Sequence, residues 1–154
     1  MIDTNNFEVG FKKVNHSLLN SWDWSKIKIR MQENFEINPK YYRDLGHGGF
    51  TLGGLDKDSY CKEVLNYLNL QKPNYHARAG MYVSTRNDSK SFSKHNDPGQ
   101  YLWIWQIIGN TKWNVEDEEI ILNCNEVLYI SPGLYHYAIP DSPRASITLS
   151  LEQE

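Results

Sequence analysis

In "NEVLYISPGLYHYAIPDSPRASITLSL" (residues 125–151), two turn signals, Pro132-Gly133 and Pro140-Asp141, separate three short apolar segments. Short apolar segments bounded by such residues are typical of β-strands. In the last segment, 144–152, apolar and polar residues alternate strictly. One face of that strand is therefore suited to pack on helices, and the other is polar. A polar inner face is expected in a barrel whose interior holds a polar ligand.

The same pattern extends back to residue 77. The predicted strands are 78–85, 92–97, 101–108, 111–116, 118–122, 126–130, 134–139 and 144–152. Many short strands joined by short turns predict a mainly β fold of the jelly-roll or small-barrel type, in preference to an open α/β sheet.

Helices are predicted only before residue 77. The stretch "SWDWSKIKIRMQENFE" (21–36) favours a helix, although the alternation of Ile27, Ile29 and Met31 equally suits a strand. Its candidate N-caps are Ser21, Asp23 and Ser25. A clearer helix is predicted over 56–70, where the apolar face is formed by Cys61, Val64, Leu65 and Leu68. Between them, "DLGHGGFTLGGL" (44–55) is rich in glycine and is predicted to be a loop. We expect a single domain, 1–154, in which a helical region, 1–76, supports a β core, 77–154.

Composition excludes several classes of protein. The 154 residues are 40% hydrophobic and 23% charged, as in globular domains. A net charge of -3 and a pI near 5.9 disfavour nucleic acid as the main partner. Arg86, Lys90 and Lys94 are interpreted as a solvated loop in preference to a ligand patch. Cys61 and Cys124 lack the spacing of a disulfide framework or metal motif. With no bilayer-length apolar stretch and no signal-peptide core, we expect a cytoplasmic protein without a membrane partner.

A candidate metal site begins at His95 and Asp97. On a strand, residues two apart point to the same side, so this pair would present an imidazole and a carboxylate to one point. The remaining histidines are His16, His47, His76 and His136. His136 has the best setting for a third ligand, because it follows a Pro-Gly turn on a short strand. Two histidines and one carboxylate leave coordination positions open, which suits non-haem Fe(II).

Each part of this site has an ordinary explanation. An isolated H-x-D pair is a weak signal, and a histidine after a turn is more often a packed or hydrogen-bonded residue. His16 and His76 have no comparable setting and are interpreted as structural or exposed. His47, among glycines, is kept only as a remote substitute ligand.

Arg144 and Ser146 form a second constellation, eight residues beyond His136. They share the polar face of the last strand. A guanidinium binds a carboxylate through two hydrogen bonds, and a serine hydroxyl adds another donor. A buried arginine is costly without an anionic partner. The alternative is that Arg144 is exposed at the start of the strand and pairs with Asp141 or another nearby acid.

Together these residues resemble the Fe(II)- and 2-oxoglutarate-dependent oxygenases. The family's iron motif, H-x-D/E…H, matches His95, Asp97 and His136, and its co-substrate motif, R-x-S, matches Arg144 and Ser146. The segments "LWIWQIIGNTKWNV" (102–115) and 125–151 resemble the JmjC and cupin-like hydroxylase branch. The resemblance covers roughly residues 79–152.

The chain departs from that branch at the usual co-substrate anchor. There, a Lys or Arg two residues before a Trp holds 2-oxoglutarate, and this position is Thr111 here. Lys112 is adjacent, but on a regular strand it would face the other way. Arg144 and Ser146 are therefore the expected anchor, with Lys112 in reserve. Branches with R-x-S often add a tyrosine from the strand before H-x-D, which points to Tyr82. A plain core role for Tyr82 is the alternative.

The resemblance implies a double-stranded β-helix, a cupin-like jelly roll, with the N-terminal helices packed on one sheet. It also implies a dioxygenase that uses Fe(II), 2-oxoglutarate and O2 to hydroxylate its substrate, with His95, Asp97 and His136 as the catalytic metal ligands. The branch implies a peptide or protein side chain as substrate, and a small molecule stays open.

Two other functions are compatible with the sequence. One is a metal-dependent cupin enzyme that does not use 2-oxoglutarate, in which Arg144 has no role. The other is a non-catalytic jelly-roll binding module, in which ligand binding would survive the substitution His95→Ala.

Overall fold

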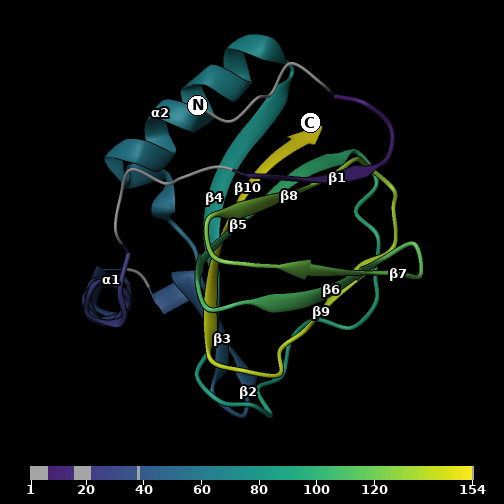
Figure 1. The fold of residues 1–154 in the computed structure, drawn as a ribbon. Coiled ribbons are helices and arrows are strands. Elements are labelled where there is room, and N and C mark those ends of the chain that lie inside the picture. Colours follow the sequence, from purple (N-terminus) through teal and green to yellow (C-terminus); the bar gives the residue numbers. More distant parts are fainter. Residues whose placement is uncertain (1–6, 16–21, 38, 154) are drawn as a thin grey trace.

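The computed structural model describes residues 7–15, 22–37 and 39–153 (Figure 1). The helices in this part are α1 (Trp24–Ile37) and α2 (Ser59–Gln71), with short 3₁₀ turns η1 (Pro39–Tyr41) and η2 (Leu55–Lys57). The strands are β1 (Phe11–Asn15), β2 (Tyr42–Gly46), β3 (Gly49–Leu52), β4 (Tyr75–Ser84), β5 (Gln100–Ile108), β6 (Thr111–Val115), β7 (Glu118–Leu122), β8 (Glu126–Ile130), β9 (His136–Ile139) and β10 (Arg144–Gln153). The predicted mainly β architecture is confirmed.

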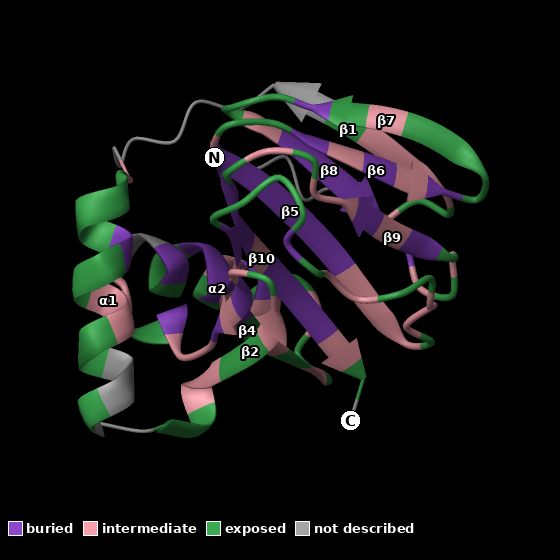
Figure 2. Cartoon of the chain, turned by 90° about the horizontal axis from the view of Figure 1, so that it is seen from below, coloured by how far each residue is buried: buried purple, intermediate pink, exposed green. Residues whose placement is uncertain are grey.

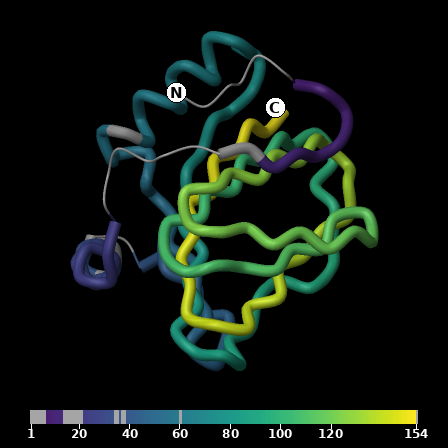
Figure 3. The backbone as a smooth tube through the Cα atoms, in the orientation of Figure 1, coloured from purple at the N-terminus to yellow at the C-terminus, as the bar shows by residue number. Residues whose placement is uncertain are grey.

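The described strands form two antiparallel sheets. The larger is seven-stranded, in the order β1-β8-β5-β10-β4-β3-β2, and the smaller is three-stranded, in the order β7-β6-β9. This order places segments distant in sequence side by side. β10 lies between β4 and β5, and β1 pairs with β8, as the contrasting colours of neighbouring segments in Figure 3 show.

The helices pack on the apolar face of the large sheet. β10 contributes Ala145, Ile147, Leu149 and Leu151 to this core, and α2 contributes Cys61, Val64, Leu65 and Leu68. The side chain of Asp58 caps α2 by accepting a hydrogen bond from the Cys61 amide at 3.2 Å. The alternation on β10 therefore predicted correctly which face meets the helices.

α1 is a helix, in spite of its strand-compatible alternation. Asp23 caps it, since its Oδ1 accepts a hydrogen bond from the Lys26 amide at 2.8 Å. Ile27 is buried, whereas Ile29 is 55% exposed, so a single stripe of α1 meets the core. Most of its surface is exposed in Figure 2, where the buried stretches concentrate on β5, β8 and β10. Neither described helix combines the length and apolar character that crossing a membrane requires.

A second apolar cluster lies between the two sheets. The large sheet contributes Leu102, Ile104, Leu128 and Ile130, and the small sheet contributes Trp113, Val115, Leu122 and Ala138. Trp103 and Trp105 point the other way, into the helix-facing core. The alternation along β5 thus divides its side chains between the two clusters.

The glycine-rich stretch 44–55 was wrongly predicted to be a loop. It contains most of a β2–β3 hairpin, in which Gly46 pairs with Gly49. The two residues between them, His47 and Gly48, both have positive φ, 52° and 75°. Positive φ at both central residues is what a tight two-residue hairpin turn requires, and glycine adopts it without strain. Here glycine therefore shapes a turn between strands.

The predicted strand over 92–97 was also wrong. This segment is irregular, apart from an isolated bridge between His95 and His136. Phe92 is its one apolar residue, so it lacks the alternation that would bury a strand face. β1 and the first residues of β4 were not predicted.

Candidate metal centre and its cavity

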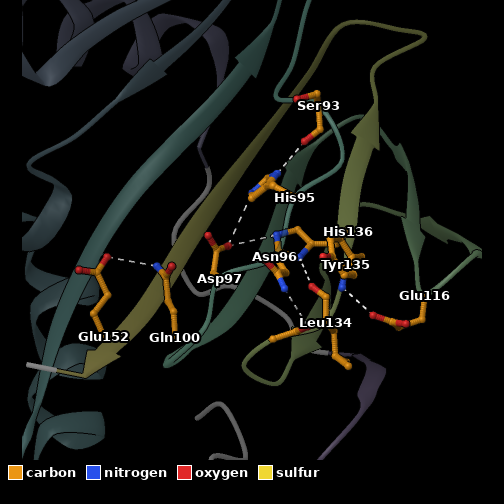
Figure 4. Close-up of polar contacts among 11 residues, drawn as sticks. Ser93, His95, Asn96, Asp97, Gln100, Glu116, Leu134, Tyr135, His136 and Glu152 are labelled. Carbon is orange, nitrogen blue, oxygen red and sulfur yellow. Dashed lines mark hydrogen bonds and ion pairs between the residues drawn. The ribbon is translucent and has the colours of Figure 1, made fainter.

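Three side chains of types that can bind a metal ion converge at the space between the sheets. His136 is the first residue of β9, and His95 and Asp97 lie on the segment that leads into β5 (Figure 4). One ligand atom from each lies within 4.8 Å of the others. The Nε2 atoms of His95 and His136 lie 3.6 and 3.3 Å from Oδ2 of Asp97. His136 is buried, and the other two are partly exposed.

Backbone hydrogen bonds hold the irregular segment against β9. The amide of His95 donates to the carbonyl of His136 at 3.2 Å, and the reverse bond measures 2.8 Å. Gly133, in the turn before β9, donates its amide to the carbonyl of Asp97 at 3.2 Å. The side chain of Asn96 donates to the carbonyl of Gly133 at 3.4 Å. The convergence of His95 and Asp97 therefore comes from these tertiary bonds.

Both imidazole rings are oriented in the way metal-binding histidines usually are. Nδ1 of His95 lies 2.7 Å from the carbonyl oxygen of Ser93, and Nδ1 of His136 lies 2.9 Å from that of Leu134. A carbonyl only accepts, so each Nδ1 carries the hydrogen. In the neutral rings, both Nε2 lone pairs then face the Asp97 carboxylate. Three acceptors that converge in this way need a shared positive charge, from a proton or a metal ion. When the shared charge is a proton on Nε2 of His136, that ring donates a hydrogen bond to Asp97, which lowers the pKa of Asp97, although partial burial opposes this.

A cavity of about 490 Å³ extends from this cluster between the sheets. Its apolar lining includes Leu102, Ile104, Trp113 and Ala138. Its polar lining includes Arg144, Thr148 and Ser150, from the polar face of β10. Two polar atoms of this lining, Nε1 of Trp113 and Oγ1 of Thr148, are buried with no hydrogen-bond partner in the described structure. Buried polar atoms usually have partners, so these two atoms give the cavity wall unused hydrogen-bonding capacity.

Arg144 is buried, with 2% of its surface exposed. Its Nε donates to Oγ of Ser84 at 3.1 Å, and its Nη1 donates to Oγ of Ser146 at 3.0 Å. No carboxylate lies within 4 Å of its guanidinium in the described structure, so the alternative of pairing with Asp141 is excluded. Burial lowers the pKa of Arg144 to about 10, against an opposing effect of Tyr82. It therefore stays cationic at neutral pH, and an anion would complete its environment.

Tyr82 lines the same cavity on β4. It lies directly opposite Ser146 in the strand pairing, and its ring packs edge-on against Phe92. Burial raises the pKa of its hydroxyl, as does the charge of Asp97, so Tyr82 is a neutral hydrogen-bonding group at physiological pH.

The remaining candidates from the sequence do not join this group. Lys112 lies on the outer face of β6, is not part of the cavity lining, and pairs with Asp141 at 3.5 Å. Thr111 is buried and donates to Oε1 of Gln106 at 3.2 Å. His47 and His76 are exposed and lie outside the cluster, and His16 lies outside the described residues.

The sequence did not indicate two residues that the β2–β3 hairpin brings to the cavity, Arg43 and Thr51. Their placement depends on pairing with β4, and a stretch interpreted as a loop gives no such register. The alternation of Phe50, Thr51 and Leu52 after the turn was the available signal.

The fold is a cupin-type double-stranded β-helix with two N-terminal helices packed on its large sheet. No protein-family model and no curated protein gave a significant match to the sequence. The class therefore rests on the likeness to solved structures.

Three of these structures illustrate the likeness. The ribosomal oxygenase YcfD from Escherichia coli, in complex with cobalt and 2-oxoglutarate, has a TM-score of 0.70 at 11% identity, over 94% of this chain and 48% of its own. KdgF from Halomonas sp. has a TM-score of 0.54 at 14% identity, and the match covers 77% of this chain and 92% of KdgF. An RmlC-like cupin from Shewanella frigidimarina has a TM-score of 0.52 at 12% identity, and the match covers 73% of this chain and 84% of that cupin. The chain thus spans about half the length of YcfD.

Proposed function

We propose that this protein is an Fe(II)- and 2-oxoglutarate-dependent dioxygenase that hydroxylates its substrate. One observation carries the proposal: His95, Asp97 and His136 line the same cavity as Arg144, a buried arginine with no acidic partner among the described residues. A metal-binding cluster alone would fit many cupin enzymes. The additional buried cation fits a co-substrate with a second carboxylate.

The roles of the residues follow from their contacts. His95, Asp97 and His136 would hold the metal through Nε2, a carboxylate oxygen and Nε2, and the carbonyls of Ser93 and Leu134 fix the two rings. Three protein ligands leave further coordination positions open to 2-oxoglutarate and O2. When bound, Fe(II) would supply activation of O2, the oxidant, coupled to decarboxylation of 2-oxoglutarate.

The rest of the cavity would position the co-substrate. Arg144, supported by Ser84 and Ser146, would bind the carboxylate of 2-oxoglutarate that is remote from the metal. Tyr82 would donate its hydroxyl hydrogen to the same carboxylate. Leu102, Ile104 and Trp113 would keep water away from the metal, which strengthens the electrostatic contacts inside.

The solved complex of YcfD with cobalt and 2-oxoglutarate supports this proposal, since a cupin-type fold like this one holds both ligands there. A peptide or protein side chain is the substrate class we carry over from the JmjC-like resemblance.

Anaerobic addition of Fe(II) and then 2-oxoglutarate tests the proposal. We expect a visible metal-to-ligand charge-transfer band that appears only when both are present. Asp97→Ala should abolish metal binding, and Arg144→Met should bind metal but need far more 2-oxoglutarate. Metal binding without any effect of 2-oxoglutarate would contradict the proposal and favour a cupin enzyme of another type. No metal binding would favour the non-catalytic module.

A further inference from the structure

We propose that Arg43 makes the cavity selective for substrates that carry an oxyanion, a carboxylate or a phosphate. The inference rests on the proposed function, because it names the substrate class of that same site. It assigns a role to the β2–β3 hairpin, which the co-substrate and metal do not require.

The strand pairing carries Arg43 to the cavity face. Arg43 pairs with Thr51, Thr51 with Tyr82, and Tyr82 with Ser146, so the four residues form one row across the large sheet. Residues in one row point to the same side, and three of these four, Arg43, Thr51 and Tyr82, line the cavity. The adjacent Asp44 belongs to the next row, which faces the opposite side of the sheet.

An aromatic ring holds Arg43 near the metal centre. Its guanidinium carbon lies 5.0 Å from the centroid of the Phe92 ring, a cation–π distance. The Phe92 ring in turn lies 6.1 Å from the ring of His95 and 5.8 Å from that of Tyr82. Arg43 is thus separated from a candidate metal ligand by one aromatic ring, and it points toward the cavity.

The charge of Arg43 is not neutralised by the protein. No carboxylate lies within 4 Å of its guanidinium in the described structure, whereas Arg30, Arg78 and Arg86 are each paired with a carboxylate. Arg86 contacts Asp88 at 2.9 Å, and Arg78, which also lines the cavity, contacts Glu152 at 3.6 Å. An exposed arginine is ordinarily solvated. Here the stacked ring restricts it to the cavity, and its forked donors match the oxygens of a carboxylate or phosphate.

The two cavity arginines without acidic partners, Arg43 and Arg144, differ in setting. Arg144 is buried among serine hydroxyls, as an anchor for a fully enclosed anion would be. Arg43 lines the same cavity but is exposed to solvent. A substrate that enters after the co-substrate would therefore meet Arg43.

Fluorine NMR with three probes that share one fluorophenyl group tests this inference: 4-fluorobenzoate, 4-fluorophenyl phosphate and the neutral 4-fluorobenzamide. The protein is first saturated with Zn(II) and 2-oxoglutarate, which occupies the Arg144 site without turnover. We expect at least one acid to bind more tightly than the amide. Arg43→Ala should weaken that acid about tenfold or more and leave the amide unchanged. Arg43→Lys should give an intermediate loss of affinity, because lysine keeps the positive charge but lacks the paired N–H donors of the guanidinium. Arg86→Ala is the matched control and should change nothing.

The identity of the preferred acid then tells carboxylate from phosphate, and either result supports the inference. Equal binding of acids and amide, no binding of either acid at millimolar concentration, or equal loss in Arg86→Ala would overturn it. A rise in the Kd of 2-oxoglutarate in Arg43→Ala would also overturn it, since Arg43 would then serve the co-substrate. If Zn(II) or 2-oxoglutarate fails to bind, the proposed function fails, and the same titration of the protein alone still reports on Arg43.

Discussion

The two faces of β10 are both buried but in different surroundings. On one face, Ala145, Ile147, Leu149 and Leu151 pack into the core beneath α2, each 0 or 1% exposed. On the other, Arg144, Ser146 and Ser150 are 2, 0 and 6% exposed, and the face looks into the cavity. Equal burial therefore has opposite energetic consequences on one strand.

Burial stabilises the first face, at about 25 cal/mol for each Å² of apolar surface removed from water. Burial of the second face costs stability, because a cation and hydroxyls leave water with few partners. A fold selected for stability alone would not keep Arg144 there. The helix-facing side of β10 therefore specifies the fold, whereas we expect the cavity side to serve a ligand.

The largest expected effect on stability is on the apolar face. Leu149→Ala should lower the free energy of unfolding by about 2–5 kcal/mol, because it leaves a cavity in a core that cannot fully collapse. Urea unfolding followed by fluorescence measures this change. The affinity of the remaining folded protein for 2-oxoglutarate should stay within about threefold of the original. A large loss of affinity for 2-oxoglutarate would show that the apolar face of β10 also contributes to ligand binding.

The next effect is on the polar face and concerns binding. Arg144→Met removes the buried charge and keeps much of the side-chain volume. We expect the free energy of unfolding to stay within about 1 kcal/mol or to rise, since replacing buried charges by apolar groups is often neutral or stabilising. The affinity for 2-oxoglutarate, measured by calorimetry with Zn(II) present, should fall about 100-fold. Destabilisation as large as that of Leu149→Ala would make Arg144 a structural residue.

A smaller effect should appear with pH. Burial lowers the pKa of Arg144 to about 10 in the free protein, and a bound carboxylate would raise it again. The affinity for glutarate, which needs no metal, should therefore be constant up to about pH 9. It should weaken by up to about tenfold per pH unit above pH 10, as the guanidinium loses its proton. Titration by NMR measures it, and Arg144→Met should remove the dependence.

The smallest effect is expected at Thr148, whose buried hydroxyl has no hydrogen-bond partner in the described structure. Thr148→Val keeps the shape and removes that hydroxyl. The protein should gain up to about 1 kcal/mol of stability, because an unsatisfied buried group is costly. Urea unfolding of the protein without ligands is the measurement. A loss of stability would show that the hydroxyl is already satisfied.

Much of the fold could be predicted because local pattern and tertiary environment agree. The strict alternation of β10 correctly placed Leu149 toward the helices and Arg144 away from them. In α2, the 3.6-residue spacing of Val64, Leu65 and Leu68 matches the stripe that packs on the sheet.

The rest could not be predicted, because it depends on contacts between distant segments. His95 and Asp97 meet His136, but not through the strand geometry that was expected; the bridge to β9 and the turn at Gly133 bring them together. Arg43 reaches the cavity only through the pairing of β2, β3 and β4. No periodicity within either segment contains this information.

The single bridge between His95 and His136 has a consequence for ligand affinity. Two of the three candidate metal ligands lie on a segment that is joined to β9 by one pair of backbone hydrogen bonds and to the preceding turn by two bonds at Gly133. Such a segment opens at a lower free energy than a strand paired along its length, and amide hydrogen exchange would register the difference. An open segment presents an incomplete ligand set. The measured metal affinity would therefore be the affinity of the closed form multiplied by the fraction of molecules that are closed.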